Sequence, residues 1–127
     1  MAKQDQKASA AVGRAGEHLA LAYLSLAGYI CTLCQIKDHD AYIQTDTQTL
    51  TLQVKTASKT HKTTNSYAFH TPKKNVDVSD VFAFVSIDLG AVIFRRGDEL
   101  TSVTTYISSK EFLNEKTSMQ KTFDSFK

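Results

Sequence analysis

The sequence predicts a single α/β domain in which helices flank a mixed β-sheet. Three patterns carry that prediction: apolar residues recur at helical spacing over residues 9–27, polar and apolar residues alternate over residues 48–56, and residues 81–87 form a nearly continuous apolar run. These patterns are typical of an amphipathic helix, a half-buried strand and a strand covered on both faces. With 127 residues the chain can bury one hydrophobic core. We therefore expect one domain over residues 1–127.

The first helix is expected over residues 9–27 and ends at Gly28, a typical C-cap. Residues 1–8 are polar, and we expect them to be disordered, as untethered termini usually are. Apolar positions at helical spacing form one stripe: Val12, Ala15, Leu19, Ala22 and Leu26. The opposite side also carries apolar residues: Ala20, Leu21 and Leu24. Such a helix is expected to pack on its own sheet and on a second surface, for which a homodimer contact is one explanation.

A β-hairpin is predicted from residues 40–45 and 48–56, joined by a two-residue turn at Asp46 and Thr47. This register sets Tyr42 opposite Thr51 and Asp40 opposite Gln53. Directly opposed residues project to the same side of a sheet, and Lys55 lies two residues beyond Gln53 on that side. The carboxylate, the amide and the ammonium group should therefore cluster. A slip of one residue would separate them.

The remaining elements follow in order. Residues 29–33 are a candidate edge strand, Tyr67 and Phe69 mark a further strand, and Pro72 opens a turn or helical segment that runs through Asp80. After the apolar run, a strand over residues 91–94 is expected to end in a polar turn at residues 95–98. The other expectations concern the C-terminal part: a capping box at residues 108–111 that starts a short helix, and a tail, residues 117–127, that docks through Met119, Phe123 and Phe126.

Charge is unevenly distributed along the chain, although the formal net charge is only +2. Residues 47–76 contain no Asp or Glu but five lysines: Lys55, Lys59, Lys62, Lys73 and Lys74. Such a basic surface suits a polyanion such as DNA. The alternative is an ordinary solvated lysine-rich surface.

Cys31 and Cys34 form a lone C-x-x-C pattern. A zinc site would need two further ligands from His39, His61 or His70, and a redox pair is the other alternative. We interpret the pair as half-buried thiols in a reducing cytosol. Residues 19–34 are interrupted by polar residues and glycine, are shorter than the roughly 20 residues of a membrane span, and lack an Ala-x-Ala cleavage pattern of a signal peptide. We therefore expect a cytoplasmic protein without a membrane segment; a targeting segment is the alternative.

The order and spacing of these motifs over residues 13–107 resemble the PD-(D/E)xK nuclease superfamily. The resemblance begins with Gly13-x-x-Gly16-Glu17 at the start of the helix, and continues with Asp40 and the strand that ends in Gln53-Val54-Lys55. It is closest to a group of intron homing endonucleases with a QxK motif, and to Holliday-junction resolvases in the first helix. The resemblance implies a restriction-endonuclease-like core with αβββαβ-like order.

The same resemblance implies the roles of the site residues. Asp40, the side-chain oxygen of Gln53 and the carbonyl of Val54 would bind Mg²⁺, or Mn²⁺, with Glu17 reaching the ion directly or through water. Lys55 would orient the attacking water and stabilise the transition state. The sequence departs from the family motif in two respects. His39 stands where the motif has proline, and Gln53 replaces an acid; Asp38 also competes with Asp40 as the ligand.

The predicted function is a metal-dependent DNA endonuclease of the homing, junction-resolving or phage-associated type. Two alternatives stay open: an inactive DNA-binding relative, and a structural or assembly protein. Two cuts on opposite strands need two sites, so a dimer or tetramer is expected, acting on double-stranded or branched DNA. Contacts with nucleic acid are expected from six basic residues: Lys59, Lys62, Lys73, Lys74, Arg95 and Arg96.

Overall fold

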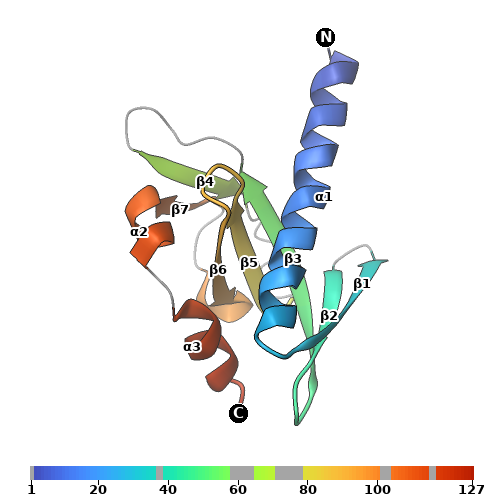
Figure 1. The fold of residues 1–127 in the computed structure, drawn as a ribbon, viewed down its shortest axis with the longest axis vertical. Coiled ribbons are helices and arrows are strands. Elements are labelled where there is room, and N and C mark those ends of the chain that lie inside the picture. The colour runs from blue at the N-terminus through green and yellow to red at the C-terminus, as the bar shows by residue number, and fades with distance from the viewer. Residues whose placement is uncertain (1, 37–38, 58–64, 71–78, 101–103, 115–116) are drawn as a thin grey trace.

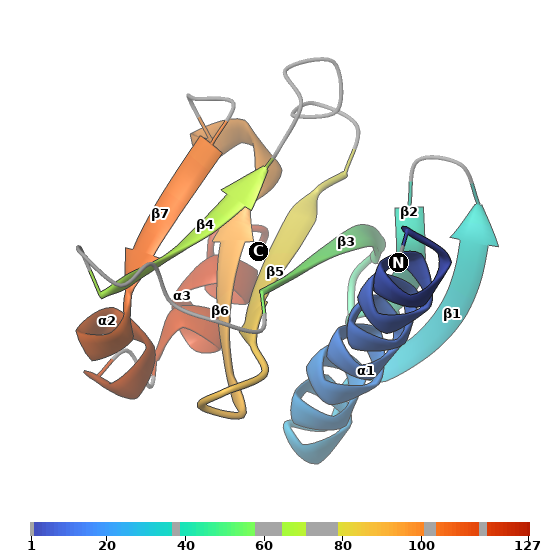
Figure 2. The ribbon, with the colours of Figure 1, turned by 90° about the horizontal axis from the view of Figure 1, so that it is seen from above.

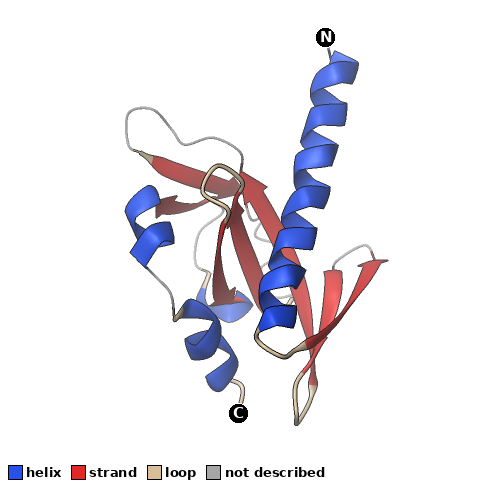
Figure 3. Cartoon of the chain, in the orientation of Figure 1, coloured by secondary structure: helices blue, strands red, loops and turns tan. Residues whose placement is uncertain are grey.

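A computed structural model describes residues 2–36, 39–57, 65–70, 79–100, 104–114 and 117–127. Figure 1 and Figure 3 show helices packed beside β-strands, with the N-terminal part of α1 extending beyond the strands. The elements in chain order are α1 (Ala2–Leu26), β1 (Ile30–Ile36), β2 (His39–Gln44), β3 (Thr49–Ala57), β4 (Ser66–His70), β5 (Val81–Ser86), β6 (Ala91–Arg96), the 3₁₀ turn η2 (Gly97–Glu99), β7 (Thr104–Ser108), α2 (Ser109–Asn114) and α3 (Ser118–Asp124). No helix in these ranges is long and apolar enough to cross a membrane.

The central sheet has five strands in the order β1-β2-β3-β5-β6. Strands β3 and β5 are parallel, and the other neighbouring pairs are antiparallel. Strands β4 and β7 form a separate antiparallel pair, which lies over β5 and β6 in Figure 2. The predicted mixed sheet with flanking helices is therefore confirmed.

Two hydrophobic clusters fill the two faces of the central sheet. One cluster packs α1 and α3 on the sheet and includes the buried side chains of Leu24, Leu52 and Phe123. The second lies between the sheet and the β4–β7 pair and includes Phe69, Phe84 and Phe112. Strand β5 contributes to both clusters, and all of its residues are buried. This explains its nearly continuous apolar sequence.

The predicted hairpin register is confirmed for residues 41–44, whereas the predicted pair of Asp40 with Gln53 is not part of the ladder. Tyr42 pairs with Thr51 and Ala41 pairs with Leu52. The Thr45 side chain stabilises the turn, because its Oγ1 accepts hydrogen bonds from the N–H groups of Thr47 and Gln48 at 3.3 and 3.1 Å. This local bonding fixes the turn without the glycine that two-residue hairpins commonly use.

Helix α1 starts earlier than predicted, and the structure shows which of its two apolar sides is buried. It begins at Ala2, so it includes residues 2–8, which were expected to be disordered. Its core face carries Gly16, Ala20 and Leu24, whereas Leu26, at the end of the predicted stripe, is 89% exposed. The helix is apolar on two sides, and periodicity alone did not choose which of them faces the sheet.

Later elements depart from the prediction in smaller ways. Strand β6 continues through Arg96, so the predicted turn starts later, at Gly97. Ser108 caps α2, because its Oγ accepts a hydrogen bond from the Glu111 N–H at 3.1 Å. Helix α3 docks on β6 through buried Phe123, as the tail was expected to do. The segment expected from Pro72 to Asp80 lies outside the described residues up to position 78.

Candidate active site at the open edge of strand β3

Strand β3 is longer than its neighbour β2. In the described chain, Ala41 and Leu52 form the last pair between the two strands, while β3 continues to Ala57, paired with β5. The β1–β2 register shifts between Leu33 and Ile36, opposite this point. Such a shift is a bulge, which bends a strand. Beyond Leu52, β3 therefore has an edge that β2 leaves open.

Asp40 occupies this open edge. Its Oδ2 accepts a hydrogen bond from the Val54 N–H at 2.7 Å. In an antiparallel pair, alternate residues direct both N–H and C=O toward the partner strand. The Thr45 N–H donates to the Gln48 carbonyl at 2.8 Å, so the backbone carbonyl of Gln48 points toward β2. Residues 50, 52 and 54 follow at intervals of two, and their N–H and C=O groups therefore point to the same side. The carboxylate thus takes the position that a β2 carbonyl would otherwise fill, and the Val54 carbonyl faces the same edge.

Gln53 presents a buried oxygen beside this carboxylate. Its Oε1 is inaccessible to solvent and has no hydrogen-bond partner within the part of the chain that the structure describes. An unsatisfied buried polar atom costs about 1–3 kcal/mol. Proteins retain such atoms where a ligand, an ion or water satisfies them. The amide oxygen is therefore suited to a divalent cation.

Lys55 projects from β3 on the same side as Gln53 and is half-buried. Burial lowers the pKa of its ammonium group, and the nearby Asp40 carboxylate raises it in part. Because the loss of hydration outweighs that attraction, the neutral amine is more accessible than in an exposed lysine.

Glu17 reaches the same carboxylate from helix α1. Burial raises the pKa of Glu17, and the negative charge of Asp40 raises it further, while His18 and Arg14 oppose the change. The approach depends on the preceding residue, because a Cβ on Gly16 would overlap Oγ1 of Thr56 on β3. A glycine at this position lets the helix backbone lie against the strand and brings Glu17 to the open edge.

The structure therefore brings four predicted residues to one edge of the sheet: Glu17, Asp40, Gln53 and Lys55. Two carboxylates, one amide oxygen and the Val54 carbonyl form an all-oxygen set of the kind that Mg²⁺ and Mn²⁺ prefer. Across the described ranges, no group of three or more His, Cys, Asp or Glu side chains is arranged to hold a metal. The candidate set fits a weakly held cation that gains further oxygens from substrate.

Several predicted residues do not join this group. Asp38, Lys59, Lys62, Lys73 and Lys74 lie outside the described residues. Cys31 and Cys34 are half-buried, and strand residues three apart are about 10 Å from each other, which is beyond disulfide reach. Arg95 donates to the Phe94 carbonyl at 2.9 Å and extends from β6, at the far side of the sheet from β2.

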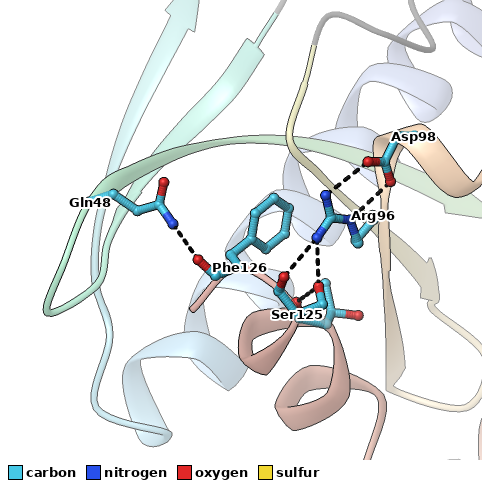
Figure 4. A network of polar contacts seen from close by, with 6 residues as sticks. Gln48, Arg96, Asp98, Ser125 and Phe126 are labelled. Carbon is cyan, nitrogen blue, oxygen red and sulfur yellow. Dashed lines mark hydrogen bonds and ion pairs between the residues drawn. The ribbon is translucent and has the colours of Figure 1, made fainter.

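Arg96, which was predicted to contact nucleic acid, ties the C-terminal segment to β6 (Figure 4). Its guanidinium group donates to both carboxylate oxygens of Asp98 at 2.9 and 2.8 Å. It also donates to the carbonyl and the hydroxyl of Ser125 at 2.9 and 3.0 Å, and lies 4.1 Å from the centre of the Phe126 ring. These contacts explain Arg96 without a nucleic-acid ligand.

Two contacts near the site were missed by the sequence analysis. Asp80 accepts hydrogen bonds from the N–H and the hydroxyl of Thr51 at 3.0 and 3.1 Å. His39 Nδ1 and Ser79 Oγ share a hydrogen bond of 2.9 Å. Each joins residues far apart in the sequence, and short-range periodicity carries no signal for such pairs.

Comparison with known structures shows which proteins share the fold of this chain. A bacterial homing endonuclease superposes with a TM-score of 0.67 and 15% identity, covering 77% of this chain and 73% of the endonuclease. The Holliday junction resolvase Hjc of Archaeoglobus fulgidus superposes with a TM-score of 0.56 and 15% identity, covering 80% of this chain and 87% of the resolvase.

The chain has the fold of the PD-(D/E)xK nucleases. The fold class predicted from the sequence is therefore confirmed. No protein-family model and no curated protein matches the sequence. At 15% identity the similarity establishes the PD-(D/E)xK fold, and the activity has to be argued from the residues themselves.

Proposed function

We propose that this chain is a metal-dependent DNA endonuclease that hydrolyses phosphodiester bonds at the open edge of β3. The observation that carries the proposal is the buried Oε1 of Gln53, which has no hydrogen-bond partner among the described residues, next in the chain to Val54, whose N–H holds the Asp40 carboxylate. Asp40, Gln53 and the Val54 carbonyl would hold Mg²⁺ or Mn²⁺, with Glu17 contributing directly or through water. When bound, such a cation lowers the pKa of a water molecule and neutralises phosphate charge.

The side chains have separate roles in this proposal. The Val54 N–H fixes one oxygen of Asp40 and thereby orients the other. Lys55 orients the attacking water and stabilises the negative charge that develops on the phosphate. Its lowered pKa makes the neutral amine accessible, so Lys55 can also accept a proton.

DNA is the proposed substrate, double-stranded or branched. Both structural neighbours are named for action on DNA, one as a homing endonuclease and one as a Holliday junction resolvase. The acid-free segment with Lys59, Lys62, Lys73 and Lys74 supplies the cationic groups for the phosphate backbone. One site cuts one strand, so a double-strand cut would need a dimer or tetramer.

A cleavage assay with matched controls tests the activity. Supercoiled, linear and four-way-junction DNA are incubated with the purified chain and Mg²⁺, Mn²⁺ or EDTA. We expect metal-dependent nicking that falls at least about 100-fold in Asp40→Asn and in Lys55→Met. The controls are Asp46→Asn in the exposed hairpin turn and Lys110→Met on α2, which should retain wild-type rates. Intact DNA under every condition would refute nuclease activity.

A second candidate function is DNA binding without cleavage. It is favoured by the neutral Gln53 at a position where most relatives carry an acid, which leaves only two carboxylates for the cation. In that case DNA would bind with the same affinity in EDTA and in Mg²⁺, and would stay intact. Binding that strengthens with metal in step with nicking would instead favour the nuclease.

A further inference from the structure

The residue before Asp40 makes a contact that the proposed chemistry does not use. His39 Nδ1 lies 2.9 Å from Ser79 Oγ, although the two residues are 40 positions apart. Ser79 is 3% exposed and precedes β5 by two residues. The hydrogen bond therefore joins the end of β2 that diverges from β3 to the start of the central buried strand.

On the β3 side no ladder pair holds His39, because the last β2–β3 pair in the described residues is Ala41 with Leu52. On the other side His39 pairs with Ile36 of β1, next to the shift in the β1–β2 register, and its carbonyl accepts a weak hydrogen bond from the Cys34 thiol at 3.6 Å. The contact with Ser79 adds an anchor to the segment that leads into β5. A proline at position 39 would restrict the backbone through its ring. Here the imidazole supplies the restraint through Ser79.

Asp40 depends on the backbone that His39 fixes. The Asp40 carboxylate meets the Val54 N–H at 2.7 Å, and that contact places it beside Gln53 and Lys55. A carboxylate on an unrestrained strand end would sample other positions, and a metal site tolerates only small displacements. Ser79 is followed by Asp80, which is bonded to Thr51 on β3, so the anchor itself is rigid.

We infer that His39 and Ser79 are positioning residues that hold Asp40 in its site through their shared hydrogen bond. The inference rests on the proposed function for its catalytic consequence, but the position of Asp40 can be measured without any metal or DNA. The Val54 amide reports it directly, because that N–H donates to the Asp40 carboxylate.

Amide hydrogen exchange tests the inference in metal-free buffer. In His39→Phe and in Ser79→Ala, exchange at Val54 should accelerate by about fivefold or more, the loss expected from one hydrogen bond. The Thr45 amide is the internal reference, because it donates to the Gln48 carbonyl at the far end of the same hairpin. Asp40→Ala calibrates complete loss of the contact.

Two further variants distinguish a loss of Asp40 positioning from a general loss of local stability. His39→Asn places an amide group near the position of Nδ1 and should restore most of the Val54 protection. In the double variant His39→Phe/Ser79→Ala, the Val54 amide should exchange no faster than in either single variant, since each substitution removes the same hydrogen bond between residues 39 and 79. Tyr23→Phe is the matched control: it removes a distant hydrogen bond from Tyr23 to the Gly90 carbonyl and should leave the Val54/Thr45 ratio unchanged.

The catalytic consequence is read separately from nicking assays. His39→Phe and Ser79→Ala should raise the Mn²⁺ concentration for half-maximal nicking about fivefold, with a smaller change in rate at saturating Mn²⁺. His39→Asn should be close to the wild type. Unchanged Val54 exchange in both single variants, or exchange in His39→Asn as fast as in His39→Phe, would overturn the inference. Absent nicking in the wild type would refute only the proposed function.

Discussion

At the scale of single residues, the most unusual group is the Gln53 side chain. Burying an amide oxygen without a partner opposes folding, and a simple hydrophobic residue would avoid that cost. Because the Gln53 amide is neutral, it adds no electrostatic repulsion near Asp40, whose charge already raises the pKa of Glu17. In the proposed site, glutamine would therefore give an oxygen ligand without adding a charge to the metal-free protein.

Gln53→Glu should make the metal-free protein less stable and the cation-bound protein relatively more stable. The added charge lies beside Asp40 in a desolvated position, so in EDTA we expect a loss of about 1–3 kcal/mol in the free energy of unfolding. Millimolar Mn²⁺ should recover most of the loss, because a cation that binds the folded state stabilises it. Urea unfolding with and without Mn²⁺ measures both effects.

The control for this substitution is Gln44→Glu, at an exposed position of β2. It should change stability little, and equally with and without Mn²⁺. A Gln53→Glu protein that gains no more from Mn²⁺ than the wild type would contradict a cation site at this oxygen.

Glu17 should make the stability of the metal-free protein depend on pH. Burial and the charge of Asp40 raise its pKa above the ordinary value of 4.5, so the charged form is disfavoured in the folded state. Below the ordinary value both states are protonated and Glu17→Gln should change stability little. As the pH rises toward neutrality the wild type loses stability relative to Glu17→Gln.

Thermal unfolding of the two proteins in EDTA from about pH 4 to pH 7 measures that difference. It should grow with pH, and it should be smaller in an Asp40→Asn background, which lacks the charge that contributes to the pKa rise. A difference that shrinks as the pH rises would contradict the assigned direction.

The sequence allowed the site residues to be predicted, but not what holds them. Alternation over residues 48–56 placed Gln53 and Lys55 on one side, and the hairpin register added Asp40. The contact of His39 with Ser79 and the contacts of Arg96 with Ser125 join residues 40 and 29 positions apart. Such contacts depend on how the strands and helices meet in three dimensions, and no local pattern encodes them.

At the scale of elements, the packing of α1 on β3 decides whether Glu17 reaches the edge. A Cβ on Gly16 would overlap the Thr56 side chain, whereas one on Gly13 would meet nothing within 4 Å. Two glycines three residues apart on one helix therefore offer a matched pair of substitutions.

Gly16→Ala should destabilise the protein by about 1–3 kcal/mol, because the helix must move away from β3. Gly13→Ala should stabilise it by up to about 1 kcal/mol, since alanine favours the helix and nothing obstructs it. Chemical denaturation measures both. Thr56→Ala should partly restore Gly16→Ala; equal effects of the two glycine substitutions would contradict the close approach.

The predicted and observed elements together show which sequence patterns are reliable. The hairpin and the buried strand β5 could be predicted because the order of polar and apolar residues along a strand follows which of its two faces are buried. The core face of α1 was not predicted, because Leu24 and Leu26 are equally apolar, yet one is buried and the other 89% exposed. Contact with the sheet decides between such faces, and that contact is not local.

At the scale of the whole molecule, the C-terminal segment connects β6 to the turn between β2 and β3. Arg96 binds Ser125 and stacks on Phe126, and the Gln48 side chain donates to the Phe126 carbonyl at 2.8 Å (Figure 4). The hairpin turn, strand β6 and the C-terminal residues are thus joined. Arg96 is thus engaged within the chain, and we propose the lysines of residues 47–76 as the basic groups that contact DNA.

Charge reversal tests this division of roles. Lys59→Glu/Lys62→Glu should weaken DNA binding and reduce its dependence on salt concentration, because these groups are proposed to neutralise phosphates. Lys110→Glu/Lys121→Glu changes the net charge equally, on α2 and α3, and should affect binding much less. Binding isotherms between about 50 and 200 mM salt make the comparison; equal effects would indicate that only the net charge matters.

The extra length of β3 relative to β2 has a consequence for solubility. A strand edge without a neighbour can accept a strand from another molecule, and proteins commonly prevent such pairing with charged side chains. Here Asp40 already bonds to the Val54 N–H, and the half-buried Lys55 lies next to it. The residues that we propose for catalysis should thereby also prevent strand pairing with another molecule at this edge. Removing both charges should leave a chain that aggregates more readily, whatever its activity.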